Sequence, residues 1–203
     1  HAGTMTVKGR QVLLPLSRTS GLRQMQARGI GFVPEDRKEE GLFLGLPIAH
    51  NIAISLHARQ SELSPARAYR SVITRIMASM NIKAASATMN VGTLSGGNQQ
   101  KIVIGKWLAR DPRLLILDEP TIGVDIGAKS EIVETVRAMA DRGMAVLVIS
   151  SELEELMAIS DRILVLHGGR IAQDMNRRDV ATEEELHHAI QGHSRPQAAL
   201  GAA

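Results

Sequence analysis

The chain of 203 residues contains no cysteine, and aromatic residues make up only 2% of it. Without cysteine, it has no disulfide framework and no Cys-ligated metal site. The scarcity of aromatic side chains means that the core is aliphatic and that platforms for base stacking are nearly missing. The formal net charge is only +3, and basic and acidic residues are interspersed. Nucleic acid is therefore disfavoured as a partner.

Long apolar runs are also missing, because none approaches the roughly 18–20 residues that span a bilayer. No signal peptide is visible at the start. The first residue is His1 rather than methionine, which is typical of a fragment. The chain is 44% hydrophobic and 22% charged, a balance that predicts one globular domain with a sizeable core over residues 1–192. Residues 193–203 are predicted to be a disordered tail.

The chemistry of the chain is concentrated in residues 91–125. Ser95 is predicted to cap a helix that begins with Gly96 and Gly97. Two glycines leave the backbone N–H groups of the first turn uncovered, at the positive end of the helix dipole. Such an end suits a phosphate, although in isolation a serine followed by two glycines is most often a simple helix cap.

A short apolar run, residues 114–117, follows Asp111 and Pro112 and is predicted to be a buried strand. It ends in two consecutive carboxylates, Asp118 and Glu119. Carboxylates at the C-terminal end of a central strand lie where open α/β sheets bind ligands. One carboxylate can hold Mg²⁺ and the next can orient a water molecule. The plain alternative is a solvated loop.

The remaining chain predicts alternating strands and helices, and so an α/β protein. The predicted helices are 22–28, 46–56, 66–80, 128–140, 153–159 and 182–191, and the predicted strands are 4–7, 10–14, 30–33, 145–149, 162–167 and 170–172. The strand 145–149 is purely aliphatic and is interpreted as buried and parallel. The charge run at 35–40 has a solvated loop as its default interpretation.

Together, these segments resemble the ATP-binding-cassette ATPases. Leu-Ser-Gly-Gly-Asn-Gln-Gln-Lys at 94–101 is similar to the signature loop, 114–119 to the Walker B strand, and 121–125 to the D-loop. Val-Pro-Glu-Asp-Arg-Lys at 33–38 and Ile-Ser-Ser-Glu at 149–152 are similar to the C-terminal, second cassette of bacterial monosaccharide importers of the ribose, galactose and xylose type. The resemblance implies a parallel core sheet, an N-terminal antiparallel β part and an α-helical subdomain at 48–92.

The phosphate-binding P-loop, G-x-x-x-x-G-K-[ST], has no match in the chain. Residues 127–130 read Gly-Ala-Lys-Ser and fail, because Ala128 separates the glycine from the lysine. We therefore expect a nucleotide-binding domain that is truncated at its N-terminus, before its P-loop. We also expect the strand 114–117 to lack a neighbour in the sheet.

The resemblance implies ATP and Mg²⁺ as cofactors. It places Glu119 at the general-base position and Ser151 where most cassettes have a histidine beside the γ-phosphate, so both are candidate catalytic residues. Glu35 stands where most cassettes have glutamine, and with Asp118 it is a candidate metal ligand. These departures imply a slow or silent half-site. The candidate nucleotide-binding residues are Leu94, Ser95, Gly96, Gly97, Asn98, Gln99, Glu35 and Asp125.

The implied function is to contribute the signature loop to ATP held by a partner cassette, either an N-terminal cassette or a second copy. Permease subunits in the membrane, and indirectly an extracytoplasmic sugar-binding protein, are the further partners. The implied location is cytoplasmic, on the inner face of the plasma membrane, and the isolated chain is expected to be inactive as an ATPase. A truncated, non-catalytic module with a regulatory or dimerisation role is the alternative, and a translation or repair cassette is less consistent with the helical 48–92 region.

Overall fold

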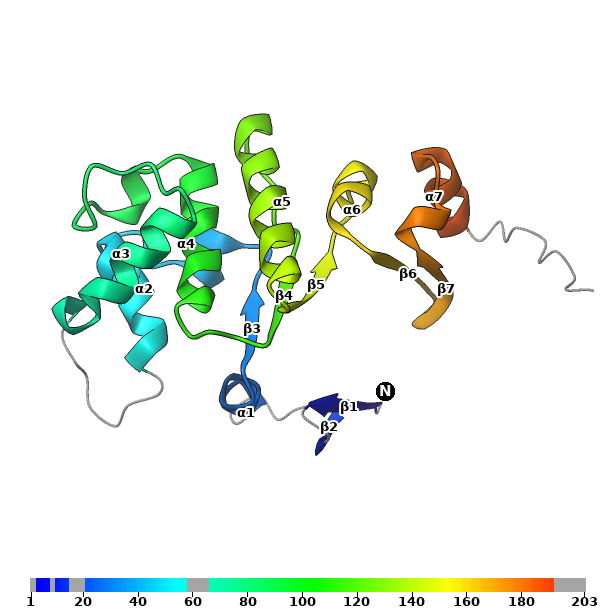
Figure 1. Cartoon of the computed structure of the whole chain (residues 1–203), viewed down its shortest axis with the longest axis horizontal. Coiled ribbons are helices and arrows are strands. Elements are labelled where there is room, and N and C mark those ends of the chain that lie inside the picture. The colour runs from blue at the N-terminus through cyan, green and yellow to red at the C-terminus, as the bar shows by residue number, and fades with distance from the viewer. Residues whose placement is uncertain (1–2, 8–9, 15–20, 58–65, 192–203) are drawn as a thin grey trace, which may run out of the picture. The chain divides into compact units, whose positions relative to one another are not determined.

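The computed structural model describes residues 3–7, 10–14, 21–57 and 66–191 (Figure 1). The chain forms two compact units, residues 1–149 and 150–203. Both units combine helices with strands, so the predicted α/β class is confirmed. The predicted tail 193–203 lies outside the described residues.

The parallel sheet of the first unit has the order β3-β4-β5. The strands described in this unit are β1 (Gly3–Val7), β2 (Arg10–Leu14), β3 (Ile30–Val33), β4 (Leu114–Asp118) and β5 (Ala145–Ile149). Strands β1 and β2 form the predicted antiparallel hairpin, in which Val7 pairs with Arg10. Strand β4 pairs with β3 on one side and β5 on the other. The expectation that 114–117 lacks a neighbouring strand is therefore wrong.

Strand β5 is parallel as predicted, but it is not buried. Leu147 is 45% exposed and Ile149 is 48% exposed, whereas Leu115 and Leu117 of β4 are fully buried. Among the described residues, β5 forms an edge of the sheet. An aliphatic run alone cannot distinguish a central strand from an edge strand, because burial depends on what packs against each face.

Helix α4 is the centre of the first unit. Its Ile102, Val103 and Ile104 are fully buried, and it contacts α2, α3, α5 and β3. The helical segments described in this unit are α1 (Gly21–Ala27), a π-helical turn (Arg37–Gly41), α2 (Ile48–His57), a 3₁₀ turn (Ala66–Tyr69), α3 (Arg70–Ser79), a second 3₁₀ turn (Val91–Thr93), α4 (Gly96–Leu108) and α5 (Ile126–Asp141). The predicted helix at 66–80 thus starts as a 3₁₀ turn.

The side chain of Asn51 on α2 is fully buried and organises the loop before this helix. Its Oδ1 accepts a hydrogen bond from the backbone N–H of Phe43 at 2.8 Å. Its Nδ2 lies within 3.2 Å of three carbonyl oxygens, those of Phe43, Leu46 and Pro47. A buried amide is costly unless it is paired, and here the pairing fixes the path of the loop.

A charged network joins α4 to α5. Lys101 is 3% exposed, and its Nζ donates to the carboxylate of Glu131 and to the backbone oxygen of Asn81 at 3.3 Å. Lys83 also donates to Glu131, at 3.2 Å. The hydrogen bonds from the two lysines lower the pKa of Glu131 to about 2. The buried lysine is therefore compensated by a carboxylate that stays charged.

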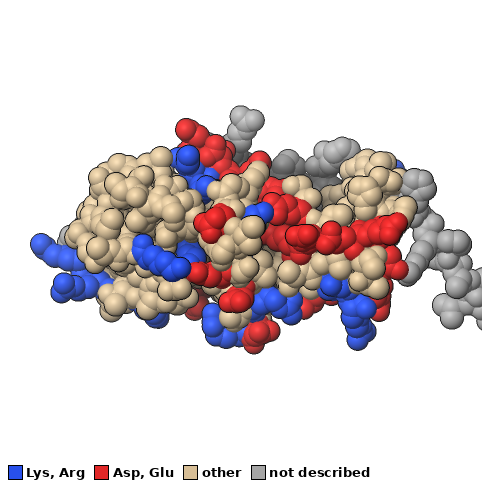
Figure 2. All heavy atoms as spheres, turned by 90° about the horizontal axis from the view of Figure 1, so that it is seen from above, with Lys and Arg blue, Asp and Glu red and all other residues tan. Residues whose placement is uncertain are grey.

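The second unit has its own small core. It contains α6 (Leu153–Ile159), β6 (Arg162–His167), β7 (Arg170–Asn176), a 3₁₀ turn (Arg177–Asp179) and α7 (Glu183–Ile190). Strands β6 and β7 pair in antiparallel fashion, and Ile163, Val165 and Leu186 are buried beneath them. Gly168 and Gly169 both have positive φ in the turn between these strands, as the predicted glycine turn requires. Acidic residues occupy the first turns of α6 and α7, and red side chains gather on this unit in Figure 2.

The backbone of Glu119, directly after β4, is in the left-handed region with φ of +45°. Its N–H donates to the carbonyl oxygen of Ile149 at 2.8 Å, and its own carbonyl accepts from Ile122 N at 3.2 Å. A residue with a Cβ pays about 1–2 kcal/mol for this conformation. Asparagine and aspartate tolerate this conformation better than glutamate does. Glutamate is therefore not the residue that backbone stability alone would favour at position 119.

The Lys101–Glu131 network predicts a pH-dependent contribution to stability. Because the folded pKa of Glu131 lies below its ordinary value of 4.5, the contribution is present above about pH 4.5 and is lost as the pH falls toward 2. Glu131→Gln should therefore lower the urea midpoint at pH 6, and its difference from the wild type should shrink on acidification. The matched control is Glu134→Gln, an exposed glutamate on the same helix. An equal effect of the two substitutions at pH 6 would contradict the prediction.

The left-handed backbone at Glu119 predicts that glycine is the most stable residue there. Glu119→Gly should exceed Glu119→Ala in free energy of unfolding by about 1 kcal/mol, because both remove the carboxylate but only glycine removes the Cβ. Urea unfolding followed by circular dichroism measures the difference. If the alanine variant is as stable as the glycine variant, the strain at this position does not exist in solution.

Candidate functional site

The tip of helix α4 is capped as the sequence predicts. Ser95 is the N-cap, and its Oγ accepts hydrogen bonds from Asn98 N at 3.5 Å and from Asn98 Nδ2 at 2.9 Å. Ser95 is exposed, Gly96 is half-buried and Gly97 is buried. The Ser95 end of the helix is therefore at the surface, whereas neighbouring segments cover Gly97 in the first turn.

The two glycines allow other segments to approach the tip closely. A Cβ on Gly97 would lie 2.4 Å from Cβ of Ala128 on α5. A Cβ on Gly96 would lie 2.9 Å from Nη2 of Arg37 and 3.1 Å from the carbonyl oxygen of Gly123. Steric exclusion by Ala128 thus requires glycine at 97, in addition to the open backbone amides that the sequence predicts, whereas a Cβ at 96 would crowd the end of the Arg37 side chain and the Gly123 carbonyl.

The neighbouring residues of the signature-like loop hold its backbone in place. Gln99 is 6% exposed, and its Nε2 donates to the carbonyl oxygens of Val91 at 3.3 Å and Leu94 at 3.1 Å. Asn98 Oδ1 accepts from Lys83 N at 2.8 Å. Of the six predicted binding residues at 94–99, Gln99 therefore directs its amide into the protein, and Ser95 is the exposed one.

The turn between β4 and α5 lies beside this tip. Asp125 is the N-cap of α5, and its Oδ1 accepts from Ala128 N at 2.9 Å. Its other oxygen, Oδ2, would lie 3.6 Å from a Cβ on Gly97. Gly123 has φ of +63°, which allows the chain to turn sharply there. The structure thus brings Asp125 together with the glycines of the tip.

The predicted carboxylates gather at the C-terminal edge of the parallel sheet. Asp118 ends β4, and Glu119 follows it directly. Glu35 follows β3, which is parallel and adjacent to β4, and its side chain is exposed. Ser151 belongs to the second unit, where it precedes α6. Within the first unit, the structure therefore places Glu35, Asp118 and Glu119 at one edge.

No group of three or more His, Cys, Asp or Glu side chains able to hold a metal ion occurs in the described part of the chain. The two predicted metal ligands, Asp118 and Glu35, would therefore leave most coordination positions to other oxygen donors. This donor set fits Mg²⁺, which is usually bound through one or two carboxylates together with substrate phosphates and water.

Two cationic residues were missed by sequence reasoning: Arg37 beside the tip of α4, and Lys106 in the last turn of the same helix. The solvated-loop interpretation of 35–40 holds for Lys38, Glu39 and Glu40, which are exposed, but not for Arg37, which is half-buried. Arg37 donates to the carbonyl oxygens of the 122–123 turn. Lys106 of α4 donates to the carbonyl oxygen of Gly41, and burial lowers the pKa of Lys106. A charge run does not reveal which of its members folds back onto the protein.

Comparison with known sequences identifies the family. The family model described as ABC transporter matches residues 1–122. The chain is 43% identical over 191 residues to the ribose import ATP-binding protein RbsA 2 of Mesorhizobium japonicum, with 93% of the chain and 37% of that protein covered. It is 39% identical over 199 residues to the xylose import ATP-binding protein XylG of Pectobacterium atrosepticum, with 96% and 38% covered. The chain thus spans somewhat over a third of the length of these relatives.

Comparison with solved structures supports the fold. The ATP-binding cassette MJ0796, in a dimeric post-hydrolysis state bound to ADP and Pi, aligns with a TM-score of 0.71 at 20% identity and covers 87% of this chain and 74% of that one. A second dimeric structure of the same cassette aligns with a TM-score of 0.67 at 21% identity, covering 80% and 68%. At this level of identity, the likeness concerns the fold.

In the part of the chain that the structure describes, no helix combines the length and the apolar character needed to cross a membrane. The parallel sheet, the capped glycine tip of α4 and the carboxylates after β4 are arranged in the fold of an ATP-binding cassette. With the family model matching more than half of its residues, the chain belongs to the ABC transporter family.

Proposed function

We propose that the chain is a segment of the ATP-binding subunit of a bacterial monosaccharide importer, and that it contributes its signature loop to ATP held by a partner cassette. The observation that carries this proposal is the exposed, Ser95-capped tip of α4 with the 123–125 turn beside it. The relatives are named ribose and xylose import ATP-binding proteins, and these names support transport as the activity and a monosaccharide as the transported substrate.

The chemistry of the tip suits a terminal phosphate. The first backbone N–H groups of a helix have no partner within the helix, and an anion at this end gains about 0.3–1 kcal/mol from the dipole. The Ser95 hydroxyl adds a donor, and the accessible residues Leu94, Ser95, Gly96 and Asn98, with Asp125, form the contact surface. In this proposal, the phosphate that docks here comes from a nucleotide held by another cassette.

The carboxylate edge of this cassette would face its own nucleotide. Asp118 and Glu35 would hold Mg²⁺ there, and the ion would supply charge neutralisation for the phosphates. In the roles that the family resemblance implies, Glu119 would be the general base and Ser151 would stand at the position that contacts the γ-phosphate. A neutral serine offers less charge stabilisation than a histidine, and Glu35 adds negative charge in place of an amide. We infer that this half-site is slow or silent.

The partners follow from this role. The tip of α4 needs a second cassette, either the N-terminal one or another copy, and the dimeric state of MJ0796 supports such pairing. Permease subunits would hold the chain at the inner face of the plasma membrane, on the cytoplasmic side. An extracytoplasmic sugar-binding protein would act through the permease, which then carries the choice of sugar.

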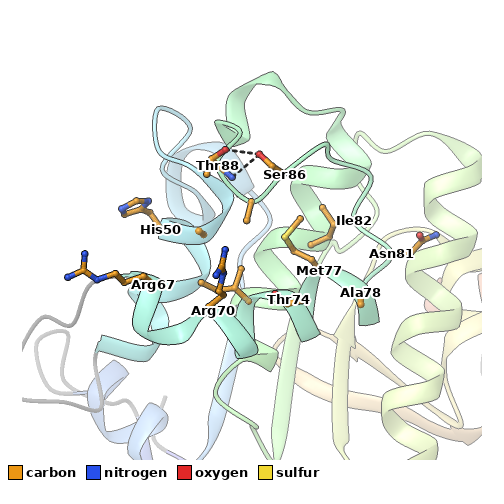
Figure 3. A pocket seen from close by; sticks show the side chains of 13 residues that line it. His50, Arg67, Arg70, Thr74, Met77, Ala78, Asn81, Ile82, Ser86 and Thr88 are labelled. Atoms are coloured by element: carbon orange, nitrogen blue, oxygen red, sulfur yellow. Dashed lines mark hydrogen bonds between the residues drawn. The ribbon is translucent and has the colours of Figure 1, made fainter.

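A hollow of about 790 Å³ in the helical region 48–92 is our candidate for the permease contact. Its apolar wall includes Ile73, Met77 and Ile82, and Arg67 and Arg70 add positive charge. Figure 3 shows Arg70 and Met77 on the opposite side of the hollow from Ser86 and Thr88. None of its lining residues is acidic. The hollow therefore fits a permease segment with apolar side chains and an acidic one.

The surface around this hollow supports such a contact. In Figure 2 the α2–α4 part, at the left, is mostly uncharged, with basic side chains near its edge. Phe43 and Leu46, on the loop before α2, are 54% and 39% exposed. Exposed apolar side chains with a basic rim are typical of a protein contact rather than of a surface that faces only water.

The second candidate function is a non-catalytic regulatory or dimerisation module. No P-loop motif occurs within these 203 residues, and a module of this kind would not need one. The two functions differ in their consequences: a module without a role in hydrolysis tolerates substitution at the tip of α4, whereas the signature loop of an ATPase does not.

The proposed role of the tip predicts unequal effects of two substitutions in the transporter assembled from the full-length ATPase and its permease. Ser95→Arg should abolish ATP hydrolysis, because it fills the phosphate position, and Glu119→Gln should cost less. The control is Ser71→Arg, at an exposed serine on α3. Steady-state phosphate release measures all three. Equal losses from Ser95→Arg and Glu119→Gln would contradict the assignment, and full activity of Ser95→Arg would favour the non-catalytic module.

The proposed permease contact predicts that reversing one charge releases the ATPase from the membrane. Arg70→Glu should weaken co-purification with the permease by about tenfold or more, because a central arginine of an interface often contributes over 1.4 kcal/mol. Arg75→Glu, on the exposed part of the same helix and outside the hollow, is the matched control. If the two variants co-purify equally well, the permease binds elsewhere.

A further inference from the structure

Arg37 joins three segments of the proposed site that are far apart in the sequence. Its Nη1 donates to the carbonyl oxygen of Ile122 at 2.8 Å, and its Nη2 donates to that of Gly123 at 3.1 Å. The same Nη2 would lie 2.9 Å from a Cβ on Gly96. The guanidinium therefore lies where the loop after β3, the turn before α5 and the tip of α4 meet.

The base of the Arg37 side chain is itself held firmly. The Asp36 carboxylate accepts from the backbone N–H groups of Lys38 at 2.9 Å and Glu39 at 3.0 Å, which fixes the start of the π-helical turn. At the other end of this turn, Lys106 of α4 donates to the carbonyl oxygen of Gly41. The turn that carries Arg37 is thus attached both to its own backbone and to α4.

The two acceptors of Arg37 are neighbouring backbone carbonyl groups. They belong to the 121–125 turn, which is exposed at Ile122 and Gly123, and in which Gly123 has positive φ. Val124 N donates to Thr121 O at 3.2 Å, so the turn has one internal backbone bond next to the Arg37 contacts. A planar guanidinium can hold two neighbouring carbonyl groups at a fixed spacing, which a lysine ammonium cannot do.

We propose that Arg37 is a positioning residue for ATP hydrolysis: it ties the loop that carries Glu35 to the 122–123 turn and so sets the position of Gly96 and Asp125 toward the partner's nucleotide. This inference rests on the proposed function. Arg37 touches no nucleotide itself; it acts through the backbone of the 121–125 turn. Ligand binding at Glu35, two residues from Arg37, is thereby coupled to the position of the surface that the partner cassette contacts.

The first test is steady-state ATP hydrolysis by the assembled transporter. Arg37→Met should lower kcat about ten- to a hundredfold with KM for ATP unchanged, because misplacement of a positioning element slows the reaction rather than binding. Arg37→Lys should recover part of the loss, since an ammonium reaches one carbonyl. Lys38→Met, which removes the same charge from the adjacent exposed residue, should keep wild-type kcat.

The second test needs no activity and uses the full-length ATPase. Amide hydrogen exchange of residues 121–125 should be at least about tenfold faster in Arg37→Met than in the wild type, and exchange in β3 should be unchanged. Wild-type exchange in this turn, or equal kcat for Arg37→Met and Lys38→Met, would overturn the inference. Loss of the proposed function is recognised separately, because Ser95→Arg would then leave hydrolysis intact.

Discussion

The tip of helix α4 reaches helix α5 only because Gly97 has no side chain. A single added carbon would overlap Ala128, so α4 and α5 would have to separate. Their contact places the Ser95 cap, the Asp125 cap and the Arg37 guanidinium around one point. Further along the helices, the buried Lys101 and Glu131 hold the same two elements together. The candidate site is therefore a product of helix packing as much as of the residues that line it.

Much of the fold is predictable from local pattern. Strand β3, strand β5 and helix α6 have the bounds that the sequence predicts, and Ser95 and Thr182 cap the expected helices. Such features depend on neighbours within a few residues. The burial of β5 was predicted wrongly, because an aliphatic run does not say whether another layer covers it. The unpaired edge expected at 114–117 was wrong for the same reason: strand order is a non-local property.

The candidate site was predictable in its residue types but not in its geometry. The glycines at 96 and 97 were expected to expose backbone amides, yet the close approach of Ala128 also requires the glycine at 97. The left-handed backbone of Glu119 could not be predicted from the sequence, because glutamate rarely adopts that conformation. Arg37 was hidden within a run of six charged residues at 35–40. Its partners are backbone carbonyl groups more than eighty positions away, and backbone acceptors have no sequence signature.

The side chain of Asn51 adds hydrogen bonds to the 43–47 loop beside the loop's own backbone bonds, such as the one from Leu46 N to Phe43 O at 2.9 Å. The exposed side chains of that loop, Phe43 and Leu46, consequently do little to maintain its shape. Mutation of Phe43 or Leu46 can therefore change the polarity of this surface while the backbone path of the loop stays the same. The buried amide of Asn51 thus allows the contact surface to evolve without a change in the backbone that supports it.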